Sequence, residues 1–196
     1  MVYVSTLSRK RRGEWCILAH YPLKNSRIVE KQQIKFHQSI RMCANICHSY
    51  EWGYTAGPPM AVAPLPNVRE VLDYAVTEIP REKIYLGIPN YGYDWPLPFA
   101  EGRTRARSLS NQEAVELAVR YSAEIQFDAA AQAPWFNYTA PDGVPHVVWF
   151  EDARSMSAKL RLIGEYGLYG AGYWNLMRPY PQGWAVLNAL YETANG

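Results

Sequence analysis

Cysteine is scarce in this chain of 196 residues, and its distribution excludes two common ways of stabilising a small domain. The three cysteines, Cys16, Cys43 and Cys47, are odd in number, which argues against a closed disulfide framework. Cys43, Cys47 and His48 have no second pair of ligands beside them, and a tetrahedral zinc site normally needs one. We therefore expect free thiols, and neither a metal nor another cofactor.

Long apolar runs are also absent. No segment approaches the roughly 20 apolar residues of a membrane-spanning helix, so no membrane partner is expected. The start, MVYVSTLSRKRRGEW, has no apolar segment after its basic cluster, so no secretory signal is expected there and the localisation stays unknown. The run GLYGAG is not followed by a helix start, which argues against a nucleotide site.

Acidic residues are rare in the first part of the chain. Residues 1–48 contain nine Lys and Arg but only two Asp and Glu. Residues 49–196 contain eleven Lys and Arg and sixteen Asp and Glu. This break predicts a divergent basic segment, 1–48, and a second part, 49–196. Such a segment either binds nucleic acid or is a solvated, poorly folded stretch. The short cluster RKRR has no recognisable binding fold around it, which favours the second interpretation and no nucleic-acid partner.

Helical and extended patterns alternate after residue 48. Helical spacing of apolar residues, and a capping box of Ser110 and Glu113, predict helices over 66–80, 110–123, 155–167 and 182–194. Short apolar runs predict strands over 84–88, 124–128, 144–150 and 167–176. The turn signal Pro-Asp-Gly predicts a hairpin between the second and third of these strands. Strands that alternate with amphipathic helices indicate an α/β fold with a parallel sheet.

Aromatic and polar residues cluster directly after the expected strands. The clusters are Tyr50-Glu51-Trp52, Tyr91-Gly92-Tyr93-Asp94-Trp95 and Trp174-Asn175. In α/β barrels the carboxyl ends of the strands build the site, so these clusters are expected to meet. Sugar rings lie on aromatic faces while their hydroxyls need Asp, Glu or Asn partners. The pattern therefore favours a sugar site.

At these residues the chain resembles glycoside hydrolase family 18, in particular its spore cortex-lytic and chitinase-like branch. Members of that branch cleave N-acetylglucosaminyl linkages in peptidoglycan. The resemblance is carried by YEWGYTAGPPMAVAP, IPNYGYDWPLPF, QAPWFNYT, VWFEDARSMSAKL and GLYGAGYWNL. These segments follow one another over roughly residues 49–190.

The resemblance implies part of a (β/α)₈ TIM barrel, from about strand five to strand eight, with a small hairpin insertion before the last strand. Val2 to Thr6 resembles the fifth strand, SYEW follows the sixth, YLGIPNYGYDW is the seventh and GAGYWNL is the eighth. The first four strands have no counterpart. Such a sheet would have exposed edges, so self-association is expected. Between Leu7 and His48 the match fails, and we hypothesise out-of-frame or otherwise scrambled coding sequence there.

The same resemblance implies roles for the clustered residues. The family uses the N-acetyl group of the substrate as its nucleophile and one Glu as general acid and base. That Glu ends the signature Asp-x-x-Asp-x-Asp-x-Glu, which this chain lacks. Tyr50 would orient the acetamide, and Trp174 would form the apolar floor under the sugar. The other substrate-binding residues implied are Glu51, Trp52, Tyr91, Tyr93, Asp94, Trp95 and Asn175.

Three hypotheses about function remain open at this point. The chain belongs to a glycosidase acting on peptidoglycan or chitin, or is a non-catalytic, lectin-like module for amino sugars, or is a non-functional fragment. In each case the expected ligand is a polysaccharide that contains N-acetylglucosamine. Without the general acid we expect no turnover by this chain alone. The family implies a location in the spore coat or cortex, the cell wall or the extracellular space.

Overall fold

The computed structural model describes residues 45–175 and 177–191. The predicted fifth strand at Val2 to Thr6 and the RKRR cluster lie outside these residues. The helices are α1 Leu65–Glu78, α2 Asn111–Arg120, α3 Ala153–Tyr166 and α4 Pro181–Leu190, with a short 3₁₀ turn at Arg81–Lys83. The strands are β1 Asn45–Cys47, β2 Ile84–Pro89, β3 Tyr91–Pro96, β4 Arg107–Ser110, β5 Gln126–Asp128, β6 Ala133–Thr139, β7 Pro145–Trp149 and β8 Gly170–Trp174.

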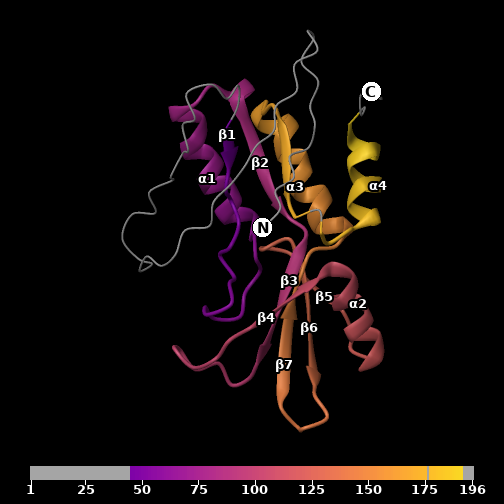
Figure 1. Cartoon of the computed structure of the whole chain (residues 1–196). Coiled ribbons are helices and arrows are strands. Elements are labelled where there is room, and N and C mark those ends of the chain that lie inside the picture. Colours follow the sequence, from indigo (N-terminus) through magenta and orange to yellow (C-terminus); the bar gives the residue numbers. More distant parts are fainter. Residues whose placement is uncertain (1–44, 176, 192–196) are drawn as a thin grey trace.

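A parallel sheet of order β1-β2-β8 forms the upper half of the molecule in Figure 1. The predicted parallel pairing is confirmed. Ile84, Leu86 and Ile88 alternate along β2 and face a core that α1 and α3 complete with Leu72 and Leu160. Residues at every second strand position share a face, so the intervening Tyr85 and Gly87 face the other way. Helix α4 packs against α3.

A second, antiparallel sheet of order β4-β3-β7-β6-β5 lies below the first, with α2 beside it (Figure 1). It spans the chain from Tyr91 to Trp149, so the expected small hairpin is wrong in extent. Pro-Asp-Gly does turn a hairpin, but the hairpin joins β7 to β6, and β5 pairs with the far side of β6. Strand β4 escaped prediction because Leu109 is its single apolar residue.

The helix boundaries follow local signals in the sequence. The capping box is present: Ser110 accepts from the backbone N–H of Glu113, whose carboxylate accepts from the backbone N–H of Ser110. Helix α3 starts two residues before the predicted position because Asp152 caps it. It ends at Gly167, whose φ of 65° lies in the left-handed region that glycine adopts most easily.

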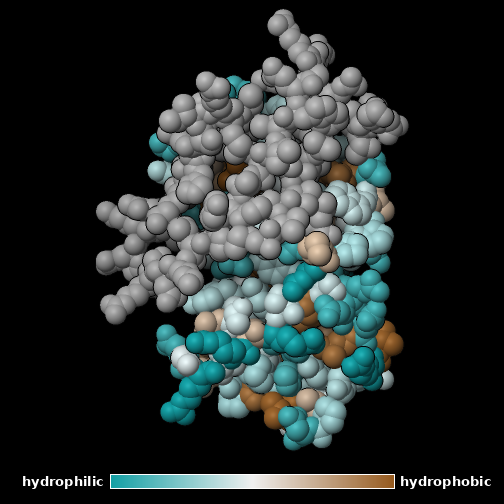
Figure 2. Space-filling view, in the orientation of Figure 1, coloured by the Kyte–Doolittle hydropathy of each residue, from teal (hydrophilic) through white to brown (hydrophobic). Residues whose placement is uncertain are grey.

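The surface seen in Figure 2 mixes polar residues with small apolar areas, one of them at the edge where Figure 1 places α2. Val115 and Val119 of this helix are 41% and 75% exposed. Within the described residues, no helix is both long enough and apolar enough to cross a membrane.

Strand β1 lies just before the division predicted at residue 48. Cys47 is buried and pairs with Leu86 of β2, so this end of the segment belongs to the parallel sheet. The division itself stays a prediction. Within the described part of the chain β1 and β8 are the edges of that sheet, and self-association through them also stays a prediction.

Candidate functional site

The carboxyl ends of β1, β2 and β8 meet at one edge of the parallel sheet. Cys47 pairs with Leu86, and Pro89 pairs with Trp174. The residues that follow these strands therefore lie close together, as the sequence predicted from the positions of its clusters. Tyr50 and Trp174 both pack against one buried group of residues that includes Tyr91 and Tyr93. The roles of these residues in sugar binding remain predictions.

Tyr50 lies against Gly87 in the middle of β2. A Cβ atom at Gly87 would come within 2.8 Å of both the Tyr50 ring and the Cys47 carbonyl oxygen, so only glycine lets the ring approach this closely. The Tyr50 hydroxyl lies 3.0 Å from Nδ1 of His48. Burial, and then the Glu51 carboxylate, raise the pKa of Tyr50. The hydroxyl therefore stays protonated at neutral pH and keeps a proton to donate.

Glu51 has its carboxylate held by two phenols of β3. The hydroxyl of Tyr91 donates to Oε1 at 3.0 Å and that of Tyr93 donates to the same oxygen at 3.5 Å. Burial, followed by the charge of Glu51, raises the pKa of both Tyr91 and Tyr93, so both remain donors. Glu51 itself has φ of 70°, which is unusual for a residue with a side chain. It is thus a positioned hydrogen-bond acceptor.

The loop after β8 is fixed by Asn90, a buried residue that the sequence analysis did not single out. Its backbone N–H donates to the Trp174 carbonyl at 2.9 Å, and its side-chain amide donates to the carbonyls of Asn175 and Arg178 at 2.8 and 2.7 Å. Oδ1 of Asn175 is buried without a hydrogen-bond partner among the described residues. The only signal for Asn90 was a polar residue directly after the strand.

Three further predicted site residues, Asp94, Trp95 and Trp52, differ in their surroundings. Asp94 points to the opposite face of β3, where it accepts from Tyr138 at 2.9 Å and lies 2.8 Å from Nδ1 of His146. Trp95 is fully buried, and its indole N–H donates to the Gly57 carbonyl at 2.8 Å. Trp52 is half-buried and packs against the core of the parallel sheet. Asp94 therefore lies on the other face of β3 from Tyr93, whereas Trp95 belongs to the same buried group as Tyr93, and the roles of both in sugar binding stay predictions.

Asp94 faces away because residues 91–96 form a strand of their own, whereas the sequence placed this cluster only as residues that follow the strand over 84–88. Successive side chains of a strand point to opposite faces. Tyr91 and Tyr93 therefore face the buried residues against which Tyr50 and Trp174 pack, and Asp94 does not. Two further aromatic residues on the same face, Trp135 and Trp149, were missed because no role was assigned to the strands that carry them.

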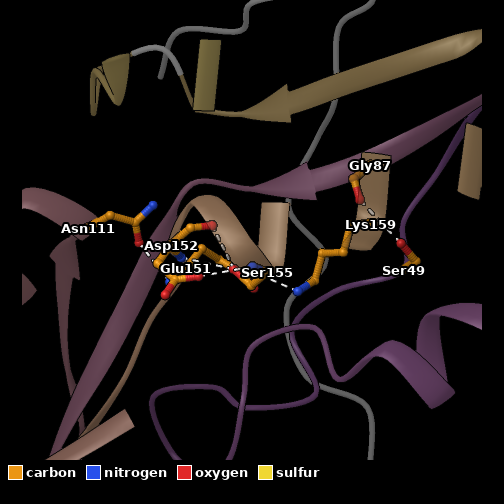
Figure 3. Close-up of polar contacts among 7 residues, drawn as sticks. All are labelled: Ser49, Gly87, Asn111, Glu151, Asp152, Ser155 and Lys159. Carbon is orange, nitrogen blue, oxygen red and sulfur yellow. Dashed lines mark hydrogen bonds and ion pairs between the residues drawn. The ribbon is translucent and has the colours of Figure 1, made fainter. Parts of the chain in front are cut away.

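A buried polar network lies at the start of α3, where the antiparallel sheet rejoins the rest of the chain (Figure 3). Lys159 donates to Oε2 of Glu151 at 2.8 Å, and Ser155 donates to the same oxygen at 2.5 Å. Oδ1 of Asn111, the first residue of α2, accepts from the backbone N–H of Glu151 at 3.0 Å. Burial raises the pKa of Glu151, against the opposing effect of Lys159.

Among the described residues, no group of His, Cys, Asp and Glu side chains is arranged to hold a metal ion.

A sequence model of glycosyl hydrolases family 18 matches residues 36–178. The chain belongs to glycosyl hydrolase family 18. The resemblance predicted from the sequence is thereby confirmed.

Several known proteins are similar to this chain in sequence or in structure. The cortical fragment-lytic enzyme of Bacillus subtilis (strain 168) is 51% identical over 144 residues, which cover 74% of this chain and 33% of the enzyme. The crystal structure of the Bacillus cereus spore cortex-lytic enzyme SleL has a TM-score of 0.71 at 46% identity, over 73% of this chain and 33% of that chain. A chitinase from Chromobacterium violaceum ATCC 12472 has a TM-score of 0.69 at 34% identity, over 77% and 46%.

The family 18 chain therefore spans about a third of the length of the curated relatives it matches, and aligns with their C-terminal part. Its parallel strands, its antiparallel sheet and the residues around Tyr50 all fall within the matched residues 36–178.

Proposed function

We propose that this chain supplies the sugar-orienting side of a family 18 glycosidase site for N-acetylglucosaminyl linkages in peptidoglycan or chitin. The observation that carries this proposal is the convergence of Tyr50, Glu51 and Trp174 at the carboxyl ends of three parallel strands. Strands β1, β2 and β8 are taken as strands six, seven and eight of a (β/α)₈ barrel. Membership of the family and similarity to spore cortex-lytic enzymes support both statements.

In the proposed mechanism the acetamide oxygen of the substrate attacks its own anomeric carbon. The protonated hydroxyl of Tyr50 donates to the acetamide and holds it in line for that attack. The ring of Trp174 supports the apolar face of the sugar. Glu51 accepts hydrogen bonds on the acetamide side, where its two phenol partners keep the carboxylate in place.

A general acid is not among the groups described at this site. The family's acid ends the run Asp-x-x-Asp-x-Asp-x-Glu, and the 196 residues contain no such run. Glu51 is a poor substitute, because its carboxylate already accepts from Tyr91 at 3.0 Å and belongs on the acetamide side. We therefore propose that this chain alone binds amino sugars without cleaving them, as a lectin-like module would. Its setting would be the spore cortex or cell wall.

Two measurements on the whole chain test this proposal. Calorimetry with the N-acetylglucosamine disaccharide should detect binding, and Trp174→Ala should remove most of it because the apolar floor is gone. Trp184→Ala is the matched control, since Trp184 lies on α4 and contacts Tyr173 instead. Binding that Trp174→Ala leaves unchanged contradicts the assignment of the floor.

Release of a chromophore from an N-acetylglucosamine oligomer measures cleavage separately. No turnover is expected from this chain. Turnover that survives in Tyr50→Phe but is lost in Glu51→Gln would overturn the assignment of the acid, because Glu51 would then be the proton donor.

A further inference from the structure

Arg178 lies in the loop after β8, and its backbone is held on both sides. Its carbonyl accepts from the side-chain amide of Asn90 at 2.7 Å, and its N–H donates to the carbonyl of Asn175 at 3.3 Å. The backbone N–H of Asn90 also donates to the carbonyl of Trp174 at 2.9 Å. One residue therefore holds both Trp174 and Arg178, so the fold sets where the Arg178 side chain starts relative to the candidate site.

The guanidinium of Arg178 lies on the face of β3 that carries the candidate site. Its Nη1 donates to Oγ of Ser108 at 2.8 Å and to the following carbonyl of β4 at 3.1 Å. Ser108 pairs with Tyr93, and directly paired residues share a face of a sheet. The guanidinium carbon also lies 5.8 Å from the centroid of the Tyr91 ring, whose hydroxyl donates to Glu51. A positive charge is thus held at the margin of the site.

Arg178 differs from the paired arginines of this structure because no acid neutralises it. Arg69, Arg107 and Arg154 each form an ion pair with a carboxylate, whereas none in residues 45–175 and 177–191 lies within 4.0 Å of the Arg178 nitrogens. Nη2 and Nε of Arg178 form no hydrogen bond within the same ranges. The side chain is half-buried, so these nitrogens remain donors for a ligand.

The two polymers that the proposed function allows differ in charge. Chitin consists of N-acetylglucosamine alone and is neutral. In peptidoglycan every second sugar is N-acetylmuramic acid, whose lactyl ether ends in a carboxyl group that is ionised at neutral pH. A guanidinium binds a carboxylate through parallel N–H donors, and such charge-assisted bonds are stronger than those to a neutral hydroxyl. An arginine without an acid partner at the margin of the site can therefore distinguish the two polymers.

We propose that Arg178 is a specificity-determining residue that binds the lactyl carboxylate of a muramic acid unit, so that the site at Tyr50 and Trp174 prefers peptidoglycan strands to chitin. This inference deepens the proposed function and rests on it, since it concerns the same site. Attachment of a peptide turns the lactyl carboxylate into a neutral amide. The preferred strand is therefore one from which hydrolysis of that amide has already removed the peptide.

Calorimetry of the whole chain with three tetrasaccharides tests this inference. The acid form alternates N-acetylglucosamine with N-acetylmuramic acid, the amide form has its lactyl carboxylates converted to primary amides, and the third is N-acetylglucosamine alone. The acid form should bind about tenfold more tightly than the amide form. Raising the salt from about 0.1 M to about 1 M shortens the Debye length from about 10 Å to about 3 Å, and should shrink this ratio.

Variants of Arg178 assign the ratio to this residue. Arg178→Gln removes the charge and should make the affinities of the acid and amide forms equal. Arg178→Lys should retain part of the ratio, because an ammonium keeps the charge without the planar fork. Arg120→Gln is the matched control, since it removes the same charge from the exposed end of α2, and it should retain the full ratio. Each ratio compares two ligands on one variant, so partial misfolding does not imitate the effect.

The possible outcomes separate this inference from the proposed function. Equal affinity of the unsubstituted chain for the acid and amide forms, with binding of the N-acetylglucosamine tetrasaccharide, overturns the role of Arg178 and leaves the site at Trp174 intact. A ratio that persists in Arg178→Gln also overturns that role, because another cation would then bind the carboxylate. Binding of none of the three tetrasaccharides refutes both.

Discussion

Replacing Lys159 with Met tests whether the buried ion pair at the start of α3 holds the antiparallel sheet to the rest of the molecule. Glu151 and Lys159 are 0% and 1% exposed, and their charged atoms lie 2.8 Å apart. Lys159→Met keeps an unbranched side chain that is one heavy atom shorter, and removes the ammonium group that bonds Glu151. The carboxylate that remains has one oxygen bonded to Ser155 and the other, Oε1, without a partner among the described residues.

Breaking a buried pair by removing one partner typically costs about 3–5 kcal/mol, because an uncompensated charge remains in the core. We expect a loss of this size in the free energy of unfolding. Urea titration monitored by tryptophan fluorescence measures it, through a lower midpoint at constant slope. The double variant Glu151→Leu, Lys159→Met removes both charges and should recover most of the lost stability.

The pH dependence gives this prediction its sharpest test. Burial already raises the pKa of Glu151, and loss of Lys159 removes the main opposing effect. The folded variant then holds a proton on Glu151 that the unfolded chain releases, so its stability falls as pH rises through the folded pKa. The deficit of Lys159→Met should be larger at about pH 8 than at about pH 5. A deficit under about 1 kcal/mol at both pH values would refute the reasoning.

Two further predictions concern positions whose role is purely geometric. Gly87→Ala should weaken disaccharide binding in calorimetry while leaving every polar group in place, because its Cβ would lie 2.8 Å from the Tyr50 ring; unchanged affinity contradicts the contact. Ser110→Ala should lower the stability by about 1 kcal/mol in urea titrations at neutral pH. The pKa of Glu113 is lowered from 4.5, first by the hydrogen bond from the Ser110 backbone N–H. The stability that the Glu113 carboxylate contributes is therefore complete above pH 4.5 and is lost as pH falls through the pKa of the folded state. Ser110→Ala keeps this backbone N–H and removes only the hydroxyl that accepts from the Glu113 backbone, so a deficit under about 0.5 kcal/mol at neutral pH contradicts the capping interaction.

The helices and the parallel strands were predictable because their signals are local. The capping box at Ser110, the glycine after α3 and the apolar alternation along β2 each act within a few residues. The capping residue Asp152 also lies within such a window, and was missed because the apolar pattern alone was used to place the start of α3. Family resemblance then supplied the order of the parallel strands, which local signals do not encode.

The antiparallel sheet was not predictable in the same way. Strand β4 has one buried residue. Strand β6, APWFNYT, has strand-favouring aromatic residues, but its pairing with both β5 and β7 is set by residues distant in the sequence. The opposite orientations of Tyr93 and Asp94 follow from a strand period of two, but only once residues 91–96 are known to be extended. The indole N–H of buried Trp95 finds its acceptor at the carbonyl of Gly57, which lies 38 residues away in the sequence. Such contacts are set by tertiary packing.

The antiparallel sheet is tied to the rest of the molecule at both of its ends. At its start, Asn90 bonds the carbonyls of Asn175 and Arg178 in the loop after β8. At its end, Glu151 is bonded to Lys159 in α3. Between these points Tyr91 reaches back to Glu51.

With both ends fixed, the strand that carries Tyr91 and Tyr93 has little freedom to move relative to Tyr50 and Trp174. Side chains that must contact one sugar need such fixed spacing, because each immobilisation delayed until binding costs affinity. The Glu151–Lys159 pair should therefore affect sugar binding although it contacts no sugar. At a urea concentration where Lys159→Met remains folded, its disaccharide affinity should be lower than that of the double variant, which restores the junction without the charges. Equal affinities would mean that the junction contributes to stability alone.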